Sequence, residues 1–241
     1  MTDLDINRRK LLAAIAGTSV ATFAGLGYAT GDAVRYTKAS SENCEDYTLD
    51  AEWRETYARD GETTLFEDTT DSGSGTEPDE PSIIQLGDIL PGDRGTVSFK
   101  LEADRTNTNA SNTVTPTLGL NLTETAENGI NNPEREAGDT SENNGELQEY
   151  LQVKVWENTG ILGFDALGAD NLTQDLSEPT IAEGTLEDVA GDLNGESLGE
   201  IDATSDGDSV SVTLRWEFTD SGDINETQTD SVTFDLNIDC Q

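Results

Sequence analysis

A strict alternation of apolar and polar residues near the C-terminus constrains the fold of this chain more than any other feature. Two stretches show it, with apolar residues at Val210, Val212, Leu214, Trp216 and Phe218, and again at Val232, Phe234, Leu236, Ile238 and Cys240. Because successive side chains of a β-strand point to opposite faces, each stretch predicts a strand with one buried face. The same phase places Cys240 on the core side.

Weaker alternation upstream predicts more strands. Residues 47–57 read as one strand, and three others bury the triplets Val97, Phe99 and Leu101, then Leu118, Leu120 and Leu122, then Leu151, Val153 and Val155. The intervening segments 68–81, 107–112 and 123–144 are polar and predict loops.

Helix is expected only once. Thr185 can cap a short helix that runs to about Leu193. Asp188 can complete a capping box with Thr185, and Gly195 is expected to end the helix. The fold class is therefore all-β, a two-sheet sandwich of jelly-roll type with one short helix. No Pro-rich linker divides the strands, which favours a single domain over residues 47–241.

The N-terminus has the charge order of an export signal. Arg8, Arg9 and Lys10 precede the weakly apolar run 11–28, which is rich in small residues. We expect residues 1–30 to form a hydrophobic helix that acts as a twin-arginine type signal and is cleaved, so that the protein is extracellular or at the cell surface and meets the membrane only through this segment. A retained anchor is the alternative, because 18 residues reach the lower limit for spanning a bilayer.

Acidic residues dominate the rest of the chain. The protein has 50 Asp and Glu, 13 Lys and Arg, and a net charge of −37. Removing the predicted signal takes away three basic and two acidic residues, which makes the net charge −38. Repulsion of this size is tolerable when molar salt shortens the Debye length to about 3 Å, so the composition indicates a halophilic protein. The absence of a basic stripe argues against nucleic-acid binding.

The composition also restricts catalysis. Without histidine the chain cannot use a Ser-His-Asp triad, a Cys-His dyad or a His-ligated zinc ion, and it has no Gly-rich phosphate loop or nucleophile elbow. We therefore expect neither an enzyme nor a cofactor. Calcium is the one open alternative, since Asp165 and Asp170, and the run from Asp202 to Asp208, offer oxygen ligands, although neither follows the EF-hand spacing.

Two modifications are expected outside the cell. Cys44 and Cys240 would pair in an oxidising environment, and the alternative is that both are unpaired small core residues. Four sequons predict exposed glycosylation sites, at Asn109, Asn121, Asn171 and Asn225.

Several motifs, in order, resemble those of the TasA/camelysin family of exported proteins. Residues 86–99 (LGDILPGDRGTVSF) resemble the family's turn-and-strand segment, and residues 145–156 resemble its "Leu-x-Val-x-Val-Trp" strand. Residues 183–189 resemble its short helix, and residues 230–236 resemble its closing strand. The basic signal is similar to those processed by SipW-type peptidases. The chain departs from haloarchaeal members at 157–163, where they have an Asp-rich, calcium-like run. The protease activity linked to camelysins is not carried over, because the chain lacks a His-Glu-x-x-His motif.

The resemblance implies a jelly-roll subunit of extracellular or biofilm matrix fibres, a homopolymer joined by donor-strand complementation. Residues 31–46 are then an extended N-terminal arm, with Val34 and Tyr36 on one phase to enter apolar pockets of the next subunit. The alternative is a monomeric cell-surface glycoprotein or glycan-binding module. For that alternative Trp156, on the phase opposite Val155, is the aromatic side chain that would form a contact surface, and the other interpretation is ordinary packing against the second sheet.

Overall fold

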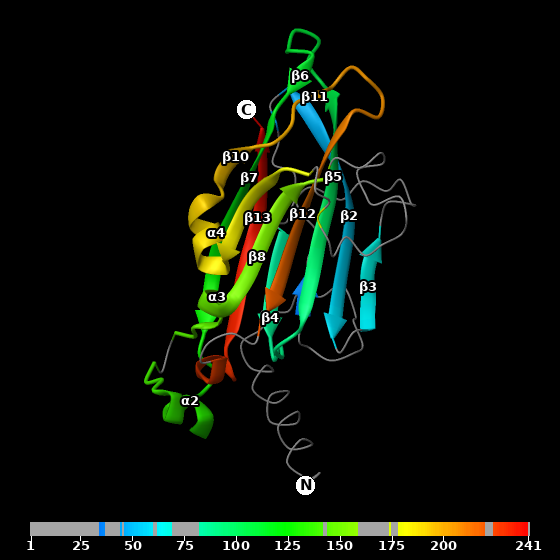
Figure 1. The fold of residues 1–241 in the computed structure, drawn as a ribbon. Helices are drawn as coiled ribbons and strands as arrows, with labels where there is room; N and C mark the ends of the chain where they lie inside the picture. The colour runs from blue at the N-terminus through cyan, green and yellow to red at the C-terminus, as the bar shows by residue number, and fades with distance from the viewer. Residues whose placement is uncertain are drawn as a thin grey trace, which may run out of the picture. The chain divides into compact units, whose positions relative to one another are not determined.

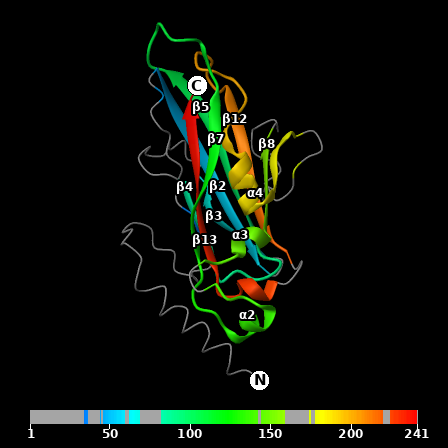
Figure 2. The ribbon, with the colours of Figure 1, turned by 90° about the vertical axis from the view of Figure 1, so that its left-hand side faces the viewer.

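Two antiparallel β-sheets packed face to face make up the sandwich (Figures 1 and 2), which confirms the predicted all-β fold class. The computed structural model describes residues 34–36, 44, 46–59, 62–68, 82–141, 144–158, 174, 178–219 and 224–240. The predicted signal (1–30), residues 31–33, 37–43 and 45 of the predicted arm, residues 69–81 of the predicted loop 68–81, the Asp165 to Asp170 segment and Asn171 lie outside these residues. Residues 34–241 cluster as one compact unit.

The larger sheet has six strands in the order β3-β2-β5-β12-β8-β9. Their bounds are β3 Glu62–Asp68, β2 Tyr47–Arg59, β5 Arg94–Arg105, β12 Ser209–Phe218, β8 Leu151–Glu157 and β9 Thr180–Thr185. The long strands β2, β5 and β12 lie side by side at its centre.

The smaller sheet has five strands in the order β1-β4-β13-β7-β10. Their bounds are β1 Val34–Tyr36, β4 Ser82–Gly87, β13 Ser231–Cys240, β7 Pro116–Ala126 and β10 Asn194–Ser197. The strands β6 (Thr113–Val114) and β11 (Ile201–Asp202) pair antiparallel and form a separate two-stranded ribbon. The chain crosses between the two sheets at nearly every connection, as in a jelly roll.

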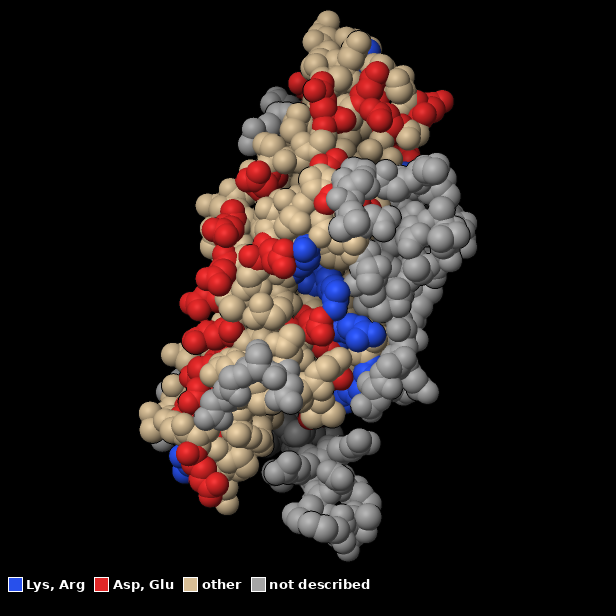
Figure 3. Space-filling view, viewed as in Figure 1, with Lys and Arg blue, Asp and Glu red and all other residues tan. Residues whose placement is uncertain are grey.

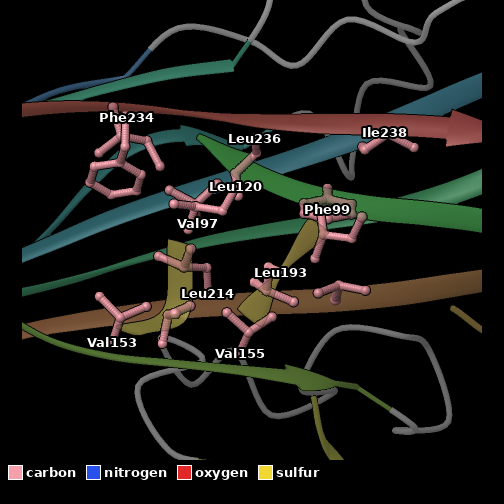
Figure 4. Packing of buried hydrophobic residues seen from close by; sticks show 14 of the residues in the cluster. Val97, Phe99, Leu120, Val153, Val155, Leu193, Leu214, Phe234, Leu236 and Ile238 are labelled. Carbon is pink, nitrogen blue, oxygen red and sulfur yellow. The ribbon is translucent and has the colours of Figure 1, made fainter. Parts of the chain in front are cut away.

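The core lies between the sheets and is built from the alternating residues (Figure 4). All five apolar positions of β12 are buried, and so are Val232, Phe234, Leu236 and Ile238 of β13. The expected inward positions of β5 and β8 are buried as well, whereas Leu122 of β7 is only partly buried. Each fully buried side chain of this size contributes about 1.5–3 kcal/mol.

The predicted helix forms as α4, Leu186–Asp192, and packs against β7, β8 and β9. The Thr185 hydroxyl accepts a hydrogen bond from the Asp188 amide at 3.2 Å, as expected for the cap. The C-cap is Leu193, and the expected stop Gly195 lies in β10 with a φ of 80°.

The prediction of one polar loop over 123–144 was wrong in part. Strand β7 continues to Ala126, and a second helix, α2 (Asn132–Ala137), follows. This helix forms because Asn131 and Glu134 make a reciprocal capping box, and it ends at Gly138, whose φ is 111°. Two further short elements are α3, Leu147–Tyr150, and the 3-10 helix η1, Ile224–Thr227.

Trp156 does not form a contact surface, and of the two interpretations its burial supports packing. Its side chain is 1% exposed, although it lies on the face of the larger sheet turned away from the core. Its cross-strand neighbour Thr213 is buried too, and the Thr213 hydroxyl lies 2.9 Å from that of Ser98. The outer face of this sheet is therefore covered at its centre, which the period of a single strand cannot reveal.

Candidate functional site

The strand predicted as a free arm forms the outer strand of the smaller sheet. β1 pairs antiparallel with β4, in the register Val34 to Leu86, Arg35 to Gln85 and Tyr36 to Ile84. On its other side β4 pairs with β13. Ile84 and Leu86 are 0% exposed. The part of the arm that the structure describes therefore lies on the edge of its own sandwich.

A disulfide fixes the chain after β1, within the predicted arm. Cys44 and Cys240 are bonded, with their Cα atoms 5.5 Å apart across 196 residues of sequence. Cys240 ends β13 and pairs with Pro116, whereas β1 lies beside the part of β4 that pairs with the first half of β13. In the loop-entropy model this bridge stabilises the fold by about 5 kcal/mol.

The sequon asparagines that the structure describes are at the surface. Asn109 is exposed between β5 and β6, Asn225 is exposed in η1, and Asn121 is exposed on β7 opposite Asp235. These three positions are accessible to a glycosylating enzyme.

On the face seen in Figure 3, acidic side chains are spread widely, whereas most of the visible Lys and Arg lie in one run over the larger sheet. Lys154 and Arg215 are cross-strand neighbours in β8 and β12. Lys154 forms an ion pair with Glu183 at 2.7 Å, and Arg215 forms one with Glu217. Because these cations already have acidic partners, the run neutralises the sheet face locally and offers little free positive charge.

The turn between β4 and β5 holds a buried carboxylate. Gly92, with a φ of 95°, lets the chain reverse so that the Asp93 amide donates to the Leu90 carbonyl at 2.8 Å. The Asp93 carboxylate accepts hydrogen bonds from the Leu90 amide at 2.8 Å, from the Tyr57 hydroxyl at 2.9 Å and from Arg59 Nε at 3.0 and 3.1 Å. Burial, together with Asp93, raises the pKa of Tyr57. This network is an ion pair that holds the turn.

A second group of carboxylates lies where β7 ends and β13 begins. Glu127 follows β7, Glu146 precedes α3 and Asp230 precedes β13, and one carboxylate oxygen of each lies within 4.8 Å of the others. The Asp230 side chain is buried, and the other two are partly buried. The sequence did not predict this group, because Asp and Glu are so frequent that no spacing among them stands out.

The surroundings of Asp230 and Glu146 disfavour the ionised form of both side chains. Burial raises the pKa of Asp230 to about 8, with Glu127 and Glu146 adding to the rise and the Glu146 amide opposing it. Burial also raises the pKa of Glu146, a hydrogen bond from Ser141 opposes the rise, and the charges of Asp139, Glu127 and Glu149 add to it. These carboxylates could hold a metal ion, which would supply the missing positive charge.

The carboxylates that the sequence left open as calcium ligands behave differently. In the Asp202 to Asp208 turn, Asp202 accepts from the amide and hydroxyl of Thr204, and its own amide donates to Asp208 Oδ2 at 2.6 Å. The hydrogen bonds from Thr204 lower the pKa of Asp202. These carboxylates hold the turn together.

Comparison of the chain with protein-family models, with curated proteins and with solved structures found no match. Within the part of the chain that the structure describes, no helix is long and apolar enough to cross a membrane. The edge strand and the acidic group are therefore the two features from which function can be argued.

Proposed function

We propose that this protein is a secreted structural subunit of extracellular fibres, and that it polymerises when β1 of one subunit pairs with β4 of the next. The observation that carries the proposal is the pairing of Val34–Tyr36 with the edge of β4. That strand precedes the disulfide and makes no other strand pairing among the described residues.

Strand exchange of this kind needs little specificity from side chains. Pairing through backbone N–H and C=O groups can be made by the same segment of another copy. If β1 leaves, β4 presents unpaired backbone groups at a sheet edge, and such an edge readily recruits a new strand. The disulfide keeps the sandwich closed during the exchange, because it holds the chain at Cys44, beyond the exchanged strand.

Three further observations support a role outside the cell. A disulfide between distant residues is typical of oxidising compartments. The strongly acidic composition suits high salt, where screening weakens repulsion between subunits. The exposed Asn109, Asn121 and Asn225 are compatible with glycosylation of an assembled surface protein.

A monomeric cell-surface glycoprotein is the second candidate. The pairing of β1 with its own sandwich favours it, because β4 then already has a partner strand within the same chain. A glycan-binding module finds less support, since Trp156 and Trp216 are buried and provide no aromatic platform.

Cross-linking between two single variants distinguishes the candidates. Arg35 and Gln85 are paired residues, so Arg35→Cys and Gln85→Cys proteins should form an intermolecular disulfide when mixed in molar salt and oxidised. Glu196→Cys, on the exposed opposite edge strand β10, is the matched control for Gln85→Cys. A monomer would give no more product with Gln85→Cys than with Glu196→Cys.

Deletion of residues 31–41, which leaves Cys44 in place, tests the polymer itself. Electron microscopy should show no fibres from the deleted protein, while the protein still caps fibres of the intact chain through its β4 edge. Replacing residues 34–36 by three prolines should act like the deletion because the ladder donors are lost, whereas three alanines retain the backbone and should weaken assembly less. Fibres of normal length from the deleted protein would disprove strand exchange.

A further inference from the structure

Each carboxylate of the acidic group has one buried oxygen without a hydrogen-bond donor. These oxygens are Glu127 Oε2, Glu146 Oε2 and Asp230 Oδ1. Asp230 is 2% exposed, and its other oxygen, Oδ2, accepts from the Glu146 amide at 2.6 Å. We propose that Glu127, Glu146 and Asp230 form a binding site for a calcium ion that joins β7, α3 and β13.

The spacing of the oxygens suits calcium. A Ca²⁺ ion binds oxygen at about 2.3–2.6 Å, so two ligands on opposite sides of it lie about 4.8 Å apart. One oxygen of each carboxylate lies within 4.8 Å of the others, which a single Ca²⁺ ion can bridge. Magnesium binds oxygen at about 2.0–2.1 Å in a stricter octahedron and usually keeps several waters, so a group of three protein carboxylates suits calcium better.

Hydrogen-bond donors are scarce around the group. The Gly129 amide donates to Glu127 Oε1 at 2.9 Å. The Thr229 hydroxyl lies 3.0 Å from the same oxygen and 2.8 Å from Glu134 Oε1, yet it has one proton to give. The ion pairs of Arg59, Lys100, Lys154 and Arg215 lie elsewhere, on Asp93 and on the outer face of the larger sheet. A cation would therefore be the main source of positive charge here.

A fourth carboxylate and a glycine complete the surroundings. Asp139 is buried, its Oδ1 accepts from the Ser141 amide at 2.7 Å, and its Oδ2 has no partner. A Cβ at Gly145 would lie 2.7 Å from Asp230 Cγ and 2.8 Å from the Ala126 carbonyl oxygen. The absence of a side chain at Gly145 thus lets the Asp230 carboxylate approach the end of β7.

The ion would tie segments that are distant in sequence. Ser231, next to Asp230, pairs with Ala126, next to Glu127, so two ligands come from the adjoining ends of neighbouring strands. The third ligand comes from the start of α3. This role concerns one subunit and holds whether or not the chain polymerises.

Calcium titration of the full exported protein tests the site. Chelator-treated protein in molar NaCl should bind about one Ca²⁺ by isothermal titration calorimetry, and saturating Ca²⁺ should raise Tm by about 5–10 °C. The same concentration of Mg²⁺ should raise Tm less. Asp230→Asn and Glu127→Gln should each weaken calcium binding at least tenfold, whereas Glu136→Gln, an exposed position of α2, should leave it unchanged.

Far-UV circular dichroism establishes that each variant is folded before titration, and the two variants are independent tests. The absence of a binding heat and of a Tm shift in the intact protein would overturn the proposal. So would equal Tm shifts with Mg²⁺ and Ca²⁺, or an unchanged calcium affinity in both variants.

Discussion

Two aspartates are almost completely buried on the connections around the smaller sheet, and their surroundings are opposite. Asp93 is 1% exposed and accepts hydrogen bonds from Arg59, Tyr57 and the Leu90 amide. Asp230 is 2% exposed and accepts one from the Glu146 amide, while Glu127 and Glu146 lie close to it. Asp93 is paired with a cation of the same chain, Arg59, whereas the charged side chains close to Asp230 are other carboxylates.

The contrast shows two ways of making a buried carboxylate tolerable. Removing an unpaired charge from water costs several kcal/mol unless an opposite charge or a proton compensates it. For Asp93 the compensation is covalently part of the protein and does not depend on the solvent. For Asp230 it must come from solution, either as a proton or, under our proposal, as a calcium ion.

The largest effect is expected from Asp93→Asn. The amide keeps the shape of the side chain but leaves Arg59 without its ion-pair partner, so the free energy of unfolding should fall by about 3 kcal/mol. Urea denaturation in molar salt measures this loss. Asp88→Asn is the control, because Asp88 is exposed and asparagine tolerates its φ of 51°, and its effect should stay within about 0.5 kcal/mol. Equal effects of the two variants would mean that the Arg59 pair adds no stability.

Asp230→Asn should change stability in the other direction. In chelator-treated protein at pH 7 the substitution removes a carboxyl group that the fold disfavours as an anion, and the free energy of unfolding should rise by about 2 kcal/mol. With saturating calcium the difference should shrink or reverse, because the intact protein then gains the ion. The same urea series, run with and without calcium, measures both. A loss of stability in chelator would show that Asp230 is compensated within the chain.

The sequence predicted the sandwich well because the alternation that indicates each strand is a local property of the chain. Alternation over ten residues, as in Ser209–Phe218, determines which side chains face the core, and the structure buries them as expected. The cap of α4 at Thr185 is similarly local. The helix α2 was missed although its capping box is visible at Asn131 and Glu134, because the polar composition of the segment outweighed that signal.

The two buried aspartates could not be predicted in the same way. Asp93 finds Arg59 across 34 residues, and Asp230 finds Glu146 across 84 residues. Such contacts depend on how the sheets align, and with 50 acidic residues the sequence offers no reason to single out any of them. The sequence left the surroundings of Trp156 open for a related reason, since the covering of a sheet's outer face is a tertiary property.

The smallest effect is expected from Arg59→Lys, which keeps the positive charge and changes only its shape. Arg59 Nε contacts both Asp93 oxygens, and Nη2 also donates to the Asp88 carbonyl at 2.9 Å. A lysine ammonium cannot reproduce this planar fork, so the free energy of unfolding should fall by about 1 kcal/mol, less than for Asp93→Asn. Arg135→Lys, at an exposed position of α2, is the matched control and should change stability by less than about 0.5 kcal/mol. If Arg59→Lys lowered the free energy of unfolding as much as Asp93→Asn, the directed hydrogen bonds of Arg59 would matter more than its charge. The difference between Asp93 and Asp230 would then lie in the geometry of their hydrogen bonds and not in the presence of a cation.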